Sequence, residues 1–566
     1  MKILLVFLTL QTNDLRSDSQ NGKFVARVMQ WENVSANNRR TFPMANRTLF
    51  QSIRGVLLPQ TTATNAAAPA YALDPQPALA QLAATGCLTH TYYASAETQL
   101  ERVLDLAAGL EPEFIARTAL YARQRGFMKD LPALLCAVLA TRDLDRLAEV
   151  FPQVIDNGKM LRNFVQILRS GVTGRKSLGT APKRLIRQWL ERASMRQLVQ
   201  ASIGNSPSLA DIVKMVHPHP ADPAREAFYA WLIGKPWNPE ALPEAVRAYE
   251  TWKQTRAGEV PDVPFQMLTA LDLGTAEWSA IAANASWQTT RMNLNTFARH
   301  GVFGDAVRVT QIAARLANPE LVRRARAFPY QLMVAYHNCD RQVPVEIREA
   351  LQDAMETAIS NVPALAGKIV VCPDVSGSMH SPVTGHQRGA TAVARCVDVA
   401  ALVTAALLRK NPGTRVLPFE VKVVDIQLNP RDSVMTNATK LAAIGGGGTN
   451  CSAPLAKLNS EKAKADLVIF VSDNESWADP KANRGTAMLQ QWEMFKLRNP
   501  RARLVCIDLT PNTTTQAHSR PDILNVGGFS DSVFDLIASF AAGADGTDHW
   551  LREINRQPLK PKMQIA

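Results

Sequence analysis

The sequence predicts a multidomain chain in which a long α-helical region is followed by a doubly wound α/β domain. Its 566 residues are too many for a single hydrophobic core. Apolar residues recur at helical spacing from about Ser95 to about residue 360. After Pro363 the pattern changes to short apolar, strand-like runs that alternate with helical segments, which is typical of a parallel sheet with right-handed crossovers.

The sequence pattern of the helical region is typical of stacked helix pairs. Apolar residues at i, i+3, i+4 and i+7 mark one helix face at 161–168, and a similar pattern returns at 185–190. Short breaks rich in glycine, proline and serine separate the helices. Many amphipathic helices joined by short turns suggest an α-solenoid. No sharp repeat period is visible, so an irregular helical domain remains an alternative.

The α/β region carries five strand-like runs, at 368–372, 414–419, 465–471, 502–507 and 523–526. Helical segments at 392–409 and 487–497 lie between them. Strands that alternate with helices predict a doubly wound parallel sheet, and the domain boundary is expected near residue 361.

The N-terminal part has a different composition. Residues 59–80 are poor in large hydrophobic side chains and rich in Ala, Thr and Pro, so 44–80 is expected to be an extended segment and linker. Residues 1–10 faintly resemble a signal peptide, but no small-residue cleavage site follows. We expect Met44 to be the natural start and 1–43 to be a non-structural extension.

Charge and cysteine content narrow the class of function. The formal net charge of +13 suggests a polyanionic partner, most simply nucleic acid. The seven cysteines are scattered and include no Cys-x-x-Cys pair, which supports neither a zinc ribbon nor a disulfide framework. Thiols within apolar segments fit a reducing compartment, so a cytoplasmic location is expected. No apolar run approaches the roughly 20 residues that cross a bilayer.

Oxygen-bearing side chains follow three separate segments of the predicted sheet domain. Asp374, Ser376 and Ser378 come directly after the first strand, Thr449 follows a run of four glycines, and Asp473 follows a third strand. The carboxyl ends of parallel strands share one edge of a sheet, where ligands bind. Carboxylates and hydroxyls are hard ligands that suit Mg²⁺ better than Zn²⁺. Taken alone, the first segment could also be an Asx turn or a helix cap.

This pattern resembles the metal-ion-dependent adhesion site of the von Willebrand factor A fold. Asp374, Ser376 and Ser378 match its first segment, Thr449 its second and Asp473 its third. The resemblance implies a divalent cation, usually Mg²⁺, whose coordination a ligand or an acidic partner completes. The glycine run fits a dinucleotide-binding loop less well, because it lacks a Gly-x-Gly-x-x-Gly register after the first strand.

A hydrolytic centre is a further alternative for the same residues. It would make Asp374 and Asp473 part of a phosphoryl-transfer site, but a two-metal centre needs more carboxylates and a positioned base. Glu475 is a candidate base, although a surface or supporting position is expected for it. No catalytic residue is therefore assigned.

A basic segment at 159–192 contains nine Lys or Arg residues and a single acid. Lys183, Arg184 and Arg187 occupy neighbouring positions on one helix, and Arg175 and Lys176 lie in the loop before it. Backbone donors and a helix N-terminus there can hold phosphate, so these residues are candidates for polyanion binding. A solvated basic helix face is the alternative.

Two histidines, His217 and His219, flank prolines just after a predicted helix at 208–216 that also carries Lys214. Without cysteine or carboxylate partners nearby they are not expected to bind zinc. The two interpretations that remain are a turn with incidental histidines and histidines that contact nucleic acid.

Together with the A-type domain, the helical segments resemble the Ro ribonucleoprotein family, whose helical part is the TROVE module. The segments that carry this resemblance are Leu-Thr-His-Thr-Tyr-Tyr (88–93), Arg-Thr-Ala-Leu-Tyr-Ala-Arg (117–123), Val-Thr-Gly-Arg-Lys-Ser-Leu-Gly-Thr-Ala-Pro-Lys-Arg (172–184) and Ser-Leu-Ala-Asp-Ile-Val-Lys-Met-Val-His-Pro (208–218). The similarity covers roughly residues 80–566 and looks closest to bacterial-type members.

The resemblance implies a monomeric ring of HEAT-like helical repeats over 81–360, closed by a von Willebrand factor A-like domain over 361–566. It also implies an RNA-binding protein rather than an enzyme. A small noncoding Y RNA would bind the outer basic surface, single-stranded ends of misfolded RNA would enter the ring, and an exoribonuclease would associate through the Y RNA. The alternative is a protein-interaction scaffold that uses the adhesion-type metal site.

The resemblance also suggests where this chain differs from its family. His217 matches a histidine that the family uses for Y RNA. Upstream of it, Gln200 and Gly204 stand where basic residues are expected. Lys214 and the cluster from Arg175 to Arg187 could compensate, because contacts to phosphate depend on charge more than on geometry.

Overall fold

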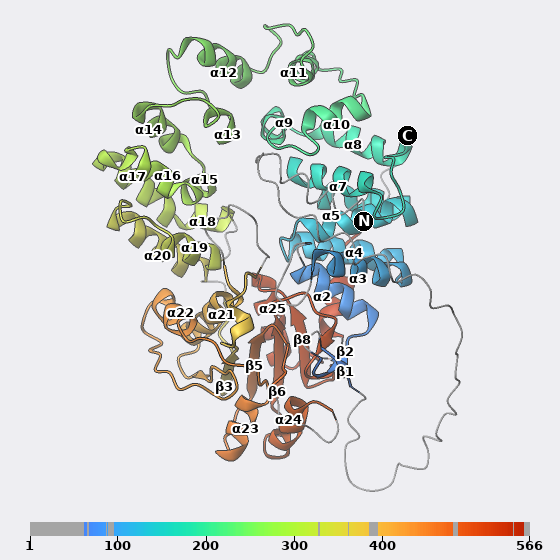
Figure 1. Ribbon diagram of the computed structural model, residues 1–566, viewed down its shortest axis with the longest axis vertical. Coiled ribbons are helices and arrows are strands. Elements are labelled where there is room, and N and C mark those ends of the chain that lie inside the picture. Colours follow the sequence, from blue (N-terminus) through green and yellow to red (C-terminus); the bar gives the residue numbers. More distant parts are fainter. Residues whose placement is uncertain are drawn as a thin grey trace, which may run out of the picture. The chain divides into compact units, whose positions relative to one another are not determined.

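The structure of the chain is a computed structural model (Figure 1). It describes residues 61–64, 67–86, 88, 95–325, 329–359, 362–383, 394–478, 485–546 and 548–559. The predicted extension at 1–43, residue 361 at the predicted domain boundary, and all but the first residue of the 88–93 motif lie outside these ranges. No helix in the described ranges is long and apolar enough to span a membrane.

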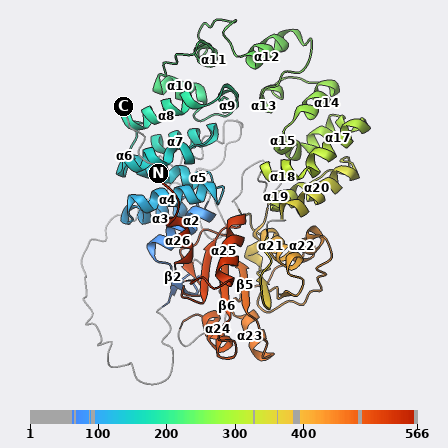
Figure 2. The same cartoon turned by 180° about the vertical axis from the view of Figure 1, so that it is seen from behind.

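Short helices in close succession fill the chain from Ala96 to Ala358 (Figures 1 and 2). Several begin at a Ser, Asp or Asn whose side chain accepts a backbone N–H of the first turn, as Ser95, Asp143 and Asn157 do. The helices are α3 (Ala96–Gly109), α4 (Pro112–Gln124), α5 (Asp130–Arg142), α6 (Leu144–Val154), α7 (Gly158–Ser170), α8 (Thr180–Arg192), α9 (Met195–Ala201), α10 (Leu209–Val216), α11 (Pro223–Ile233), α12 (Glu244–Thr255), α13 (Phe265–Leu268), α14 (Thr275–Asn284), α15 (Trp287–Met292), α16 (Leu294–Arg299), α17 (Ala306–Ala317), α18 (Pro319–Ala325), α19 (Pro329–His337) and α20 (Val345–Ala358).

A recurring arginine tether links successive parts of this helical region. Each tether is a guanidinium that donates to a backbone carbonyl near the end of an earlier helix. Three of the four pairs are 35 residues apart and the fourth is 33 apart: Arg142 to Ala107, Arg175 to Ala140, Arg225 to Leu190 and Arg315 to Ala282. Carbonyls in the last turn of a helix have no partner within the helix. The tether therefore satisfies them and fixes one repeat against the next.

Loss of one tether is expected to destabilise the helical region measurably. Arg225 bonds the carbonyls of both Leu190 and Ala193. Arg225→Gln should lower the free energy of unfolding by about 1.5–3 kcal/mol, because a hydrogen bond to a charged group usually contributes this much to stability. Urea unfolding followed by the helical circular dichroism signal measures this. The exposed Arg247, changed to Gln, is the matched control, and an equal loss in both variants would contradict a specific tether.

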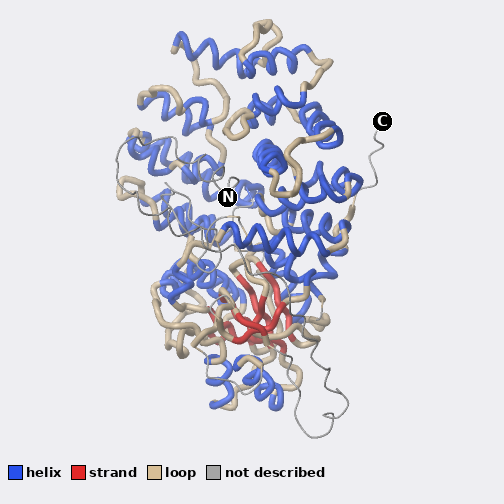
Figure 3. The backbone as a smooth tube through the Cα atoms, turned by 45° about the vertical axis from the view of Figure 1, so that its right-hand side comes forward, coloured by secondary structure: helices blue, strands red, loops and turns tan. Residues whose placement is uncertain are grey.

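The described residues from 362 onward form the predicted doubly wound domain. Its five-stranded sheet has the order β4-β3-β5-β6-β8, and every neighbouring pair is parallel. The strands are β3 (Ile369–Pro373), β4 (Arg415–Val416), β5 (Leu467–Ser472), β6 (Arg503–Asp508) and β8 (Ile523–Gly527). Each lies within or overlaps one of the five predicted runs. Figure 3 shows the strands gathered in one part of the molecule with helices around them.

The helices of this domain cover a sheet whose central strands are buried throughout. Every residue of β3 and β5 is buried, which explains why both read as continuous apolar runs rather than as alternating patterns. The helices are α21 (Cys396–Lys410), α22 (Val434–Ala442), α23 (Ala453–Ser460), α24 (Ala487–Arg498), α25 (Asp531–Ala541) and α26 (His549–Asn555). The predicted fold class, a helical region followed by a doubly wound domain, is confirmed.

The prediction of a linker over 59–80 was wrong for its described part. Residues 69–72 form strand β2 (Pro69–Ala72), which pairs with β7 (Thr514–Thr515), and helix α2 (Pro75–Thr85) follows directly. Alanine is the strongest helix former and needs little room, so a composition typical of a linker also suits a helix packed closely against other elements. The buried face of α2 contacts β8 of the sheet.

Both ends of the helical region contact the sheet domain. Near its start, Arg117 of α4 donates to the carbonyls of Asn555 and Gln557, at 2.6 and 2.5 Å. Near its end, α19 and α20 contact α21 and α22, and the backbone N–H of Val434 donates to Glu356 at 3.0 Å. Single side-chain contacts continue the series where the helices are more loosely packed, from α11 to α12, from α12 to the end of α13 and from α13 to α14. The helical region therefore begins and ends against the sheet domain.

Candidate functional site

The five predicted metal ligands meet at one place on the sheet. Strand β3 lies between β4 and β5, so the chain runs to one side of β3 and then crosses to the other. The crevice outside such a switch point is where doubly wound sheets bind ligands. Asp374 follows β3 and Asp473 follows β5, on the two strands that flank this crevice.

Hydrogen bonds join the predicted ligands into one cluster. The hydroxyl of Thr449 donates to that of Ser376 at 2.9 Å, and the hydroxyls of Ser376 and Ser378 are 3.3 Å apart. The backbone N–H of Ser376 donates to Oδ1 of Asp374 at 2.9 Å. All five side chains are buried, the most exposed being Ser378 at 6%. Three segments far apart in sequence therefore deliver two carboxylates and three hydroxyls to one small volume.

The electrostatics of this cluster favour a bound cation. Burial raises the pKa of Asp374, and burial together with the charge of Asp374 raises the pKa of Asp473 to about 8. In the part of the chain that the structure describes, neither carboxylate forms an ion pair with a basic side chain. Two buried carboxylates without a compensating positive charge fit a divalent cation, which would be held by Asp374, Asp473 and the three hydroxyls.

Further residues, which were not predicted from the sequence, hold the candidate metal ligands in place. Ser472, the last residue of β5, donates to Oδ2 of Asp374 at 2.6 Å. Glu420 accepts the backbone N–H of Gly447 at 2.8 Å, and Gly377 donates to the carbonyl of Gly447 at 2.8 Å. The glycine run is thereby fastened beside the first segment. Ser472 could have been found because it directly precedes Asp473.

A further buried carboxylate, Asp508, lies at the end of β6. Its Oδ2 accepts hydrogen bonds from Gln81 of α2 and from Asn474, both at 3.1 Å, and burial raises its pKa. These amide donors come from two different parts of the chain, so Asp508 connects the N-terminal helix to the edge of the sheet. No cluster of three or more His, Cys, Asp or Glu side chains within the described ranges is arranged as a metal site.

The predicted polyanion-binding residues lie on α8, on the loop before it and on α10, two helices that pack together. Lys176, Lys214 and His217 are exposed, whereas Lys183 and Arg184 are half-buried. Arg187 donates to the carbonyl of Val216 at 2.5 Å. That contact brings Arg187 next to His217.

Two of the predicted arginines also have structural partners. Arg175 is one of the tethers, with 2.7 Å to the carbonyl of Ala140, and Arg187 bonds the last turn of α10. A guanidinium has five N–H donors, so each can hold a carbonyl and still present donors to an anion. Lys176, Lys183 and Lys214 form no salt bridge within the described ranges.

Arg162 of α7 lies beside Gly204, one of the two positions where the family resemblance leads us to expect a basic residue. It donates to the carbonyl of Ala201 at 2.9 Å, and its guanidinium lies beside Gly204, where a Cβ would be only 2.7 Å from one of its nitrogens. The absence of a side chain at Gly204 makes room for Arg162. A positive charge thus lies at this position although residues 200 and 204 are neutral. Burial lowers the pKa of Arg162.

Comparisons with known proteins agree with this architecture. Residues 368–541 match the family model of the Ro60 vWA domain. The chain is 26% identical over 546 residues to the RNA-binding protein RO60 of Deinococcus radiodurans, covering 88% of this chain and 99% of that protein. It is 22% identical over 249 residues to the RNA-binding protein RO60 of Caenorhabditis elegans, covering 42% of this chain and 38% of that one.

A solved structure shows the same fold. The crystal structure of the Deinococcus radiodurans RO (RSR) protein superposes with a TM-score of 0.57 at 20% identity, over 83% of this chain and all of that one. The comparisons therefore confirm the resemblance to the Ro family that the motifs predict, with residues 368–541 similar to the Ro60 vWA domain.

Proposed function

We propose that this protein binds RNA through the basic residues of α7, α8 and α10. Two observations together support this proposal. A relative named as an RNA-binding protein aligns with this chain along 99% of its own length, and these helices carry a cluster of basic side chains that form no salt bridge within the described ranges. Phosphate contacts need charge in the right region rather than a fixed side-chain set. Lys176, Lys183 and Lys214 supply such charge, and Arg175, Arg184, Arg187 and His217 surround them.

The proposal extends to the kind of RNA. A structured, small noncoding RNA of the Y type binds the outer basic surface, and single-stranded ends of misfolded RNA enter the space enclosed by the helices and the sheet domain. Such a protein acts in RNA quality control or processing in the cytoplasm, without a catalytic centre of its own, and an exoribonuclease can be recruited through the bound RNA. The contacts of both ends of the helical region with the sheet domain support the enclosed geometry.

A salt titration tests the RNA-binding proposal. Binding of a stem–loop RNA with a single-stranded 3′ tail, measured by filter retention, should weaken steeply as salt rises. A protein that makes six to ten phosphate contacts loses roughly 10³- to 10⁵-fold in affinity between about 50 and 200 mM salt. Affinity that does not change over this range would contradict the proposal.

A second candidate function is a metal-dependent scaffold for a protein partner. Trp477 is 55% exposed and its backbone N–H donates to the carbonyl of Thr449, one of the candidate ligands. An exposed aromatic ring next to a cation could contact a partner whose acidic side chain completes the coordination. The same titration separates the two functions, because a scaffold gives no salt-dependent RNA binding.

A further inference from the structure

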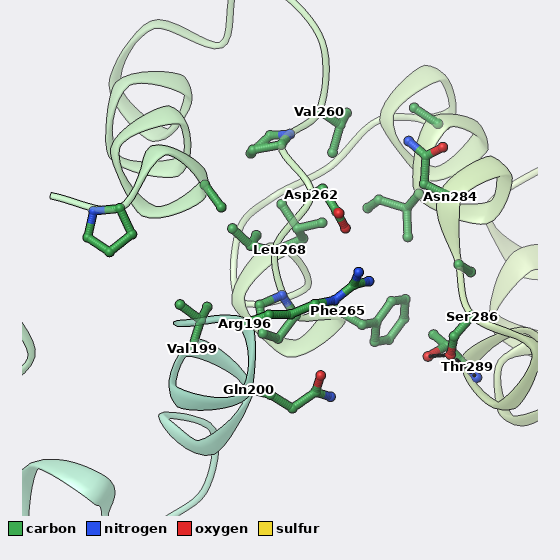
Figure 4. Close-up of a pocket in the computed structure, with 18 of the residues that line it drawn as sticks. Arg196, Val199, Gln200, Val260, Asp262, Phe265, Leu268, Asn284, Ser286 and Thr289 are labelled. Carbon is green, nitrogen blue, oxygen red and sulfur yellow. Dashed lines mark hydrogen bonds between the residues drawn. The ribbon is translucent and has the colours of Figure 1, made fainter. Parts of the chain in front are cut away.

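A cavity of about 370 Å³ lies between α9 and the segment that contains α13, α14 and the start of α15 (Figure 4). It is separate from the metal cluster and from the candidate residues of α8 and α10. Figure 4 shows Arg196, Asp262 and Phe265 reaching toward its middle, with Gln200 and Asn284 toward opposite ends. A volume of this size accommodates a small molecule or a single nucleotide unit.

Four polar side chains that line this cavity are exposed and have no partner among the described residues. Arg196, Gln200, Asp262 and Asn284 form no side-chain hydrogen bond or ion pair with any other described residue. The arginines of the tethers, in contrast, are bonded to backbone carbonyls. Four unpaired polar side chains around one cavity leave donors and acceptors available for a ligand.

An aromatic ring supplies a platform in the same cavity. Phe265 is half-buried, and its ring packs against Trp278, with 5.9 Å between the ring centroids. Trp278 is itself stacked on His300 at 4.3 Å. A ring supported from behind keeps one orientation, and single-stranded RNA is recognised by stacking unpaired bases on such rings.

The side chains of Asp262 and Arg196 together favour guanine over the other bases. A carboxylate accepts two hydrogen bonds, and guanine presents two neighbouring donors, N1–H and the N2 amino group. Adenine, cytosine and uracil lack such a pair of donors. A guanidinium donates two parallel bonds, and the O6 and N7 atoms of guanine accept them. Asp262 and Arg196 thus match two different edges of one guanine.

We propose that this cavity binds one unstacked guanine of single-stranded RNA, stacked on Phe265 and read by Asp262 and Arg196. This rests on the proposed RNA binding and adds a base preference to it. In this proposal the amide of Gln200 faces the RNA and can form hydrogen bonds with it. A Lys or Arg at this position would instead contribute mainly positive charge.

The experiment compares short oligouridine probes that carry a single central G or A, or neither, by fluorescence anisotropy with the full chain. A good bidentate contact discriminates by about 1–3 kcal/mol, so the G probe should bind roughly 5- to 150-fold more tightly than the other two. Guanosine monophosphate should compete with the G probe and leave the oligouridine probe bound, whereas adenosine monophosphate should compete with neither.

Two isosteric variants make the test specific. Asp262→Asn should remove the preference for G, so that the G probe binds no more tightly than the A probe or oligouridine. Glu259→Gln removes the same charge from an exposed neighbour that does not line the cavity, and should keep the preference. Equal binding of all three probes by the unaltered protein would overturn the guanine site, even if guanosine monophosphate binds. The proposal that the protein binds RNA would not be affected by that result. Absence of any RNA binding would instead refute the proposed function.

Discussion

Asp473→Asn is expected to stabilise the metal-free protein and to abolish its stabilisation by Mg²⁺. Without a cation, folding must bury two neighbouring carboxylates or take up a proton, and either costs free energy. The pKa of Asp473, raised to about 8 by burial and by Asp374, expresses this cost. One unit of pKa shift corresponds to about 1.4 kcal/mol, so removing the charge should raise the free energy of unfolding by about 1–3 kcal/mol.

With Mg²⁺ present this advantage of the variant should be cancelled or reversed. A cation at a hundred times its dissociation constant stabilises the native state by about 2.7 kcal/mol, and the variant that has lost a ligand should gain nothing. Thermal unfolding with MgCl₂ and with a chelator measures both effects. Asp508→Asn is the matched control, because Asp508 is equally buried at the same edge of the sheet but is bonded by Gln81 and Asn474. That variant should keep the response to Mg²⁺.

A response to Mg²⁺ that survives Asp473→Asn would exclude Asp473 as a ligand. A metal-free protein that is weakened by the same substitution would show that the carboxylate has another partner. The opposite signs of the two effects distinguish a ligand from a side chain that only fills space, since a packing defect destabilises the protein whether or not the cation is present.

The sheet and the convergence of the metal cluster could be predicted because local sequence determines them. Buried parallel strands such as β3 and β5 are continuous apolar runs, and their carboxyl ends must meet at one edge. Residues placed just after those strands, Asp374 and Asp473, therefore converge whatever the details of the loops. The length of each element matters little to this argument, which is why it succeeds from spacing alone.

Other features could not be predicted because they depend on contacts between distant segments. The segment of α2 has the composition of a linker, and only its packing on β8 makes it an ordered helix. Each arginine tether joins two residues 33–35 positions apart, but arginines are too frequent in this chain for these four to stand out as tethers. Arg162, which supplies a cation beside Gly204, is 42 positions away from it in sequence.

Reversing two charges on α8 is expected to weaken RNA binding by roughly two orders of magnitude. Lys183→Glu/Arg184→Glu changes the local charge by four units. Each phosphate contact with single-stranded RNA contributes about 0.7 to the slope of log K against log salt, so four units correspond to roughly 100-fold in affinity near physiological salt. The slope itself should fall, because fewer counterions are released when RNA binds. Filter binding over a salt series gives both quantities.

The location of the charge, rather than its amount, is what this experiment tests. Lys462→Glu/Lys464→Glu makes the same change at two exposed lysines after α23 in the sheet domain, and should alter affinity by much less. Nonspecific attraction by a protein of net charge +13 would instead weaken equally in both variants, because it depends on total charge. A large loss confined to the α8 variant, with unchanged thermal stability, therefore identifies the basic helices as the RNA-binding surface.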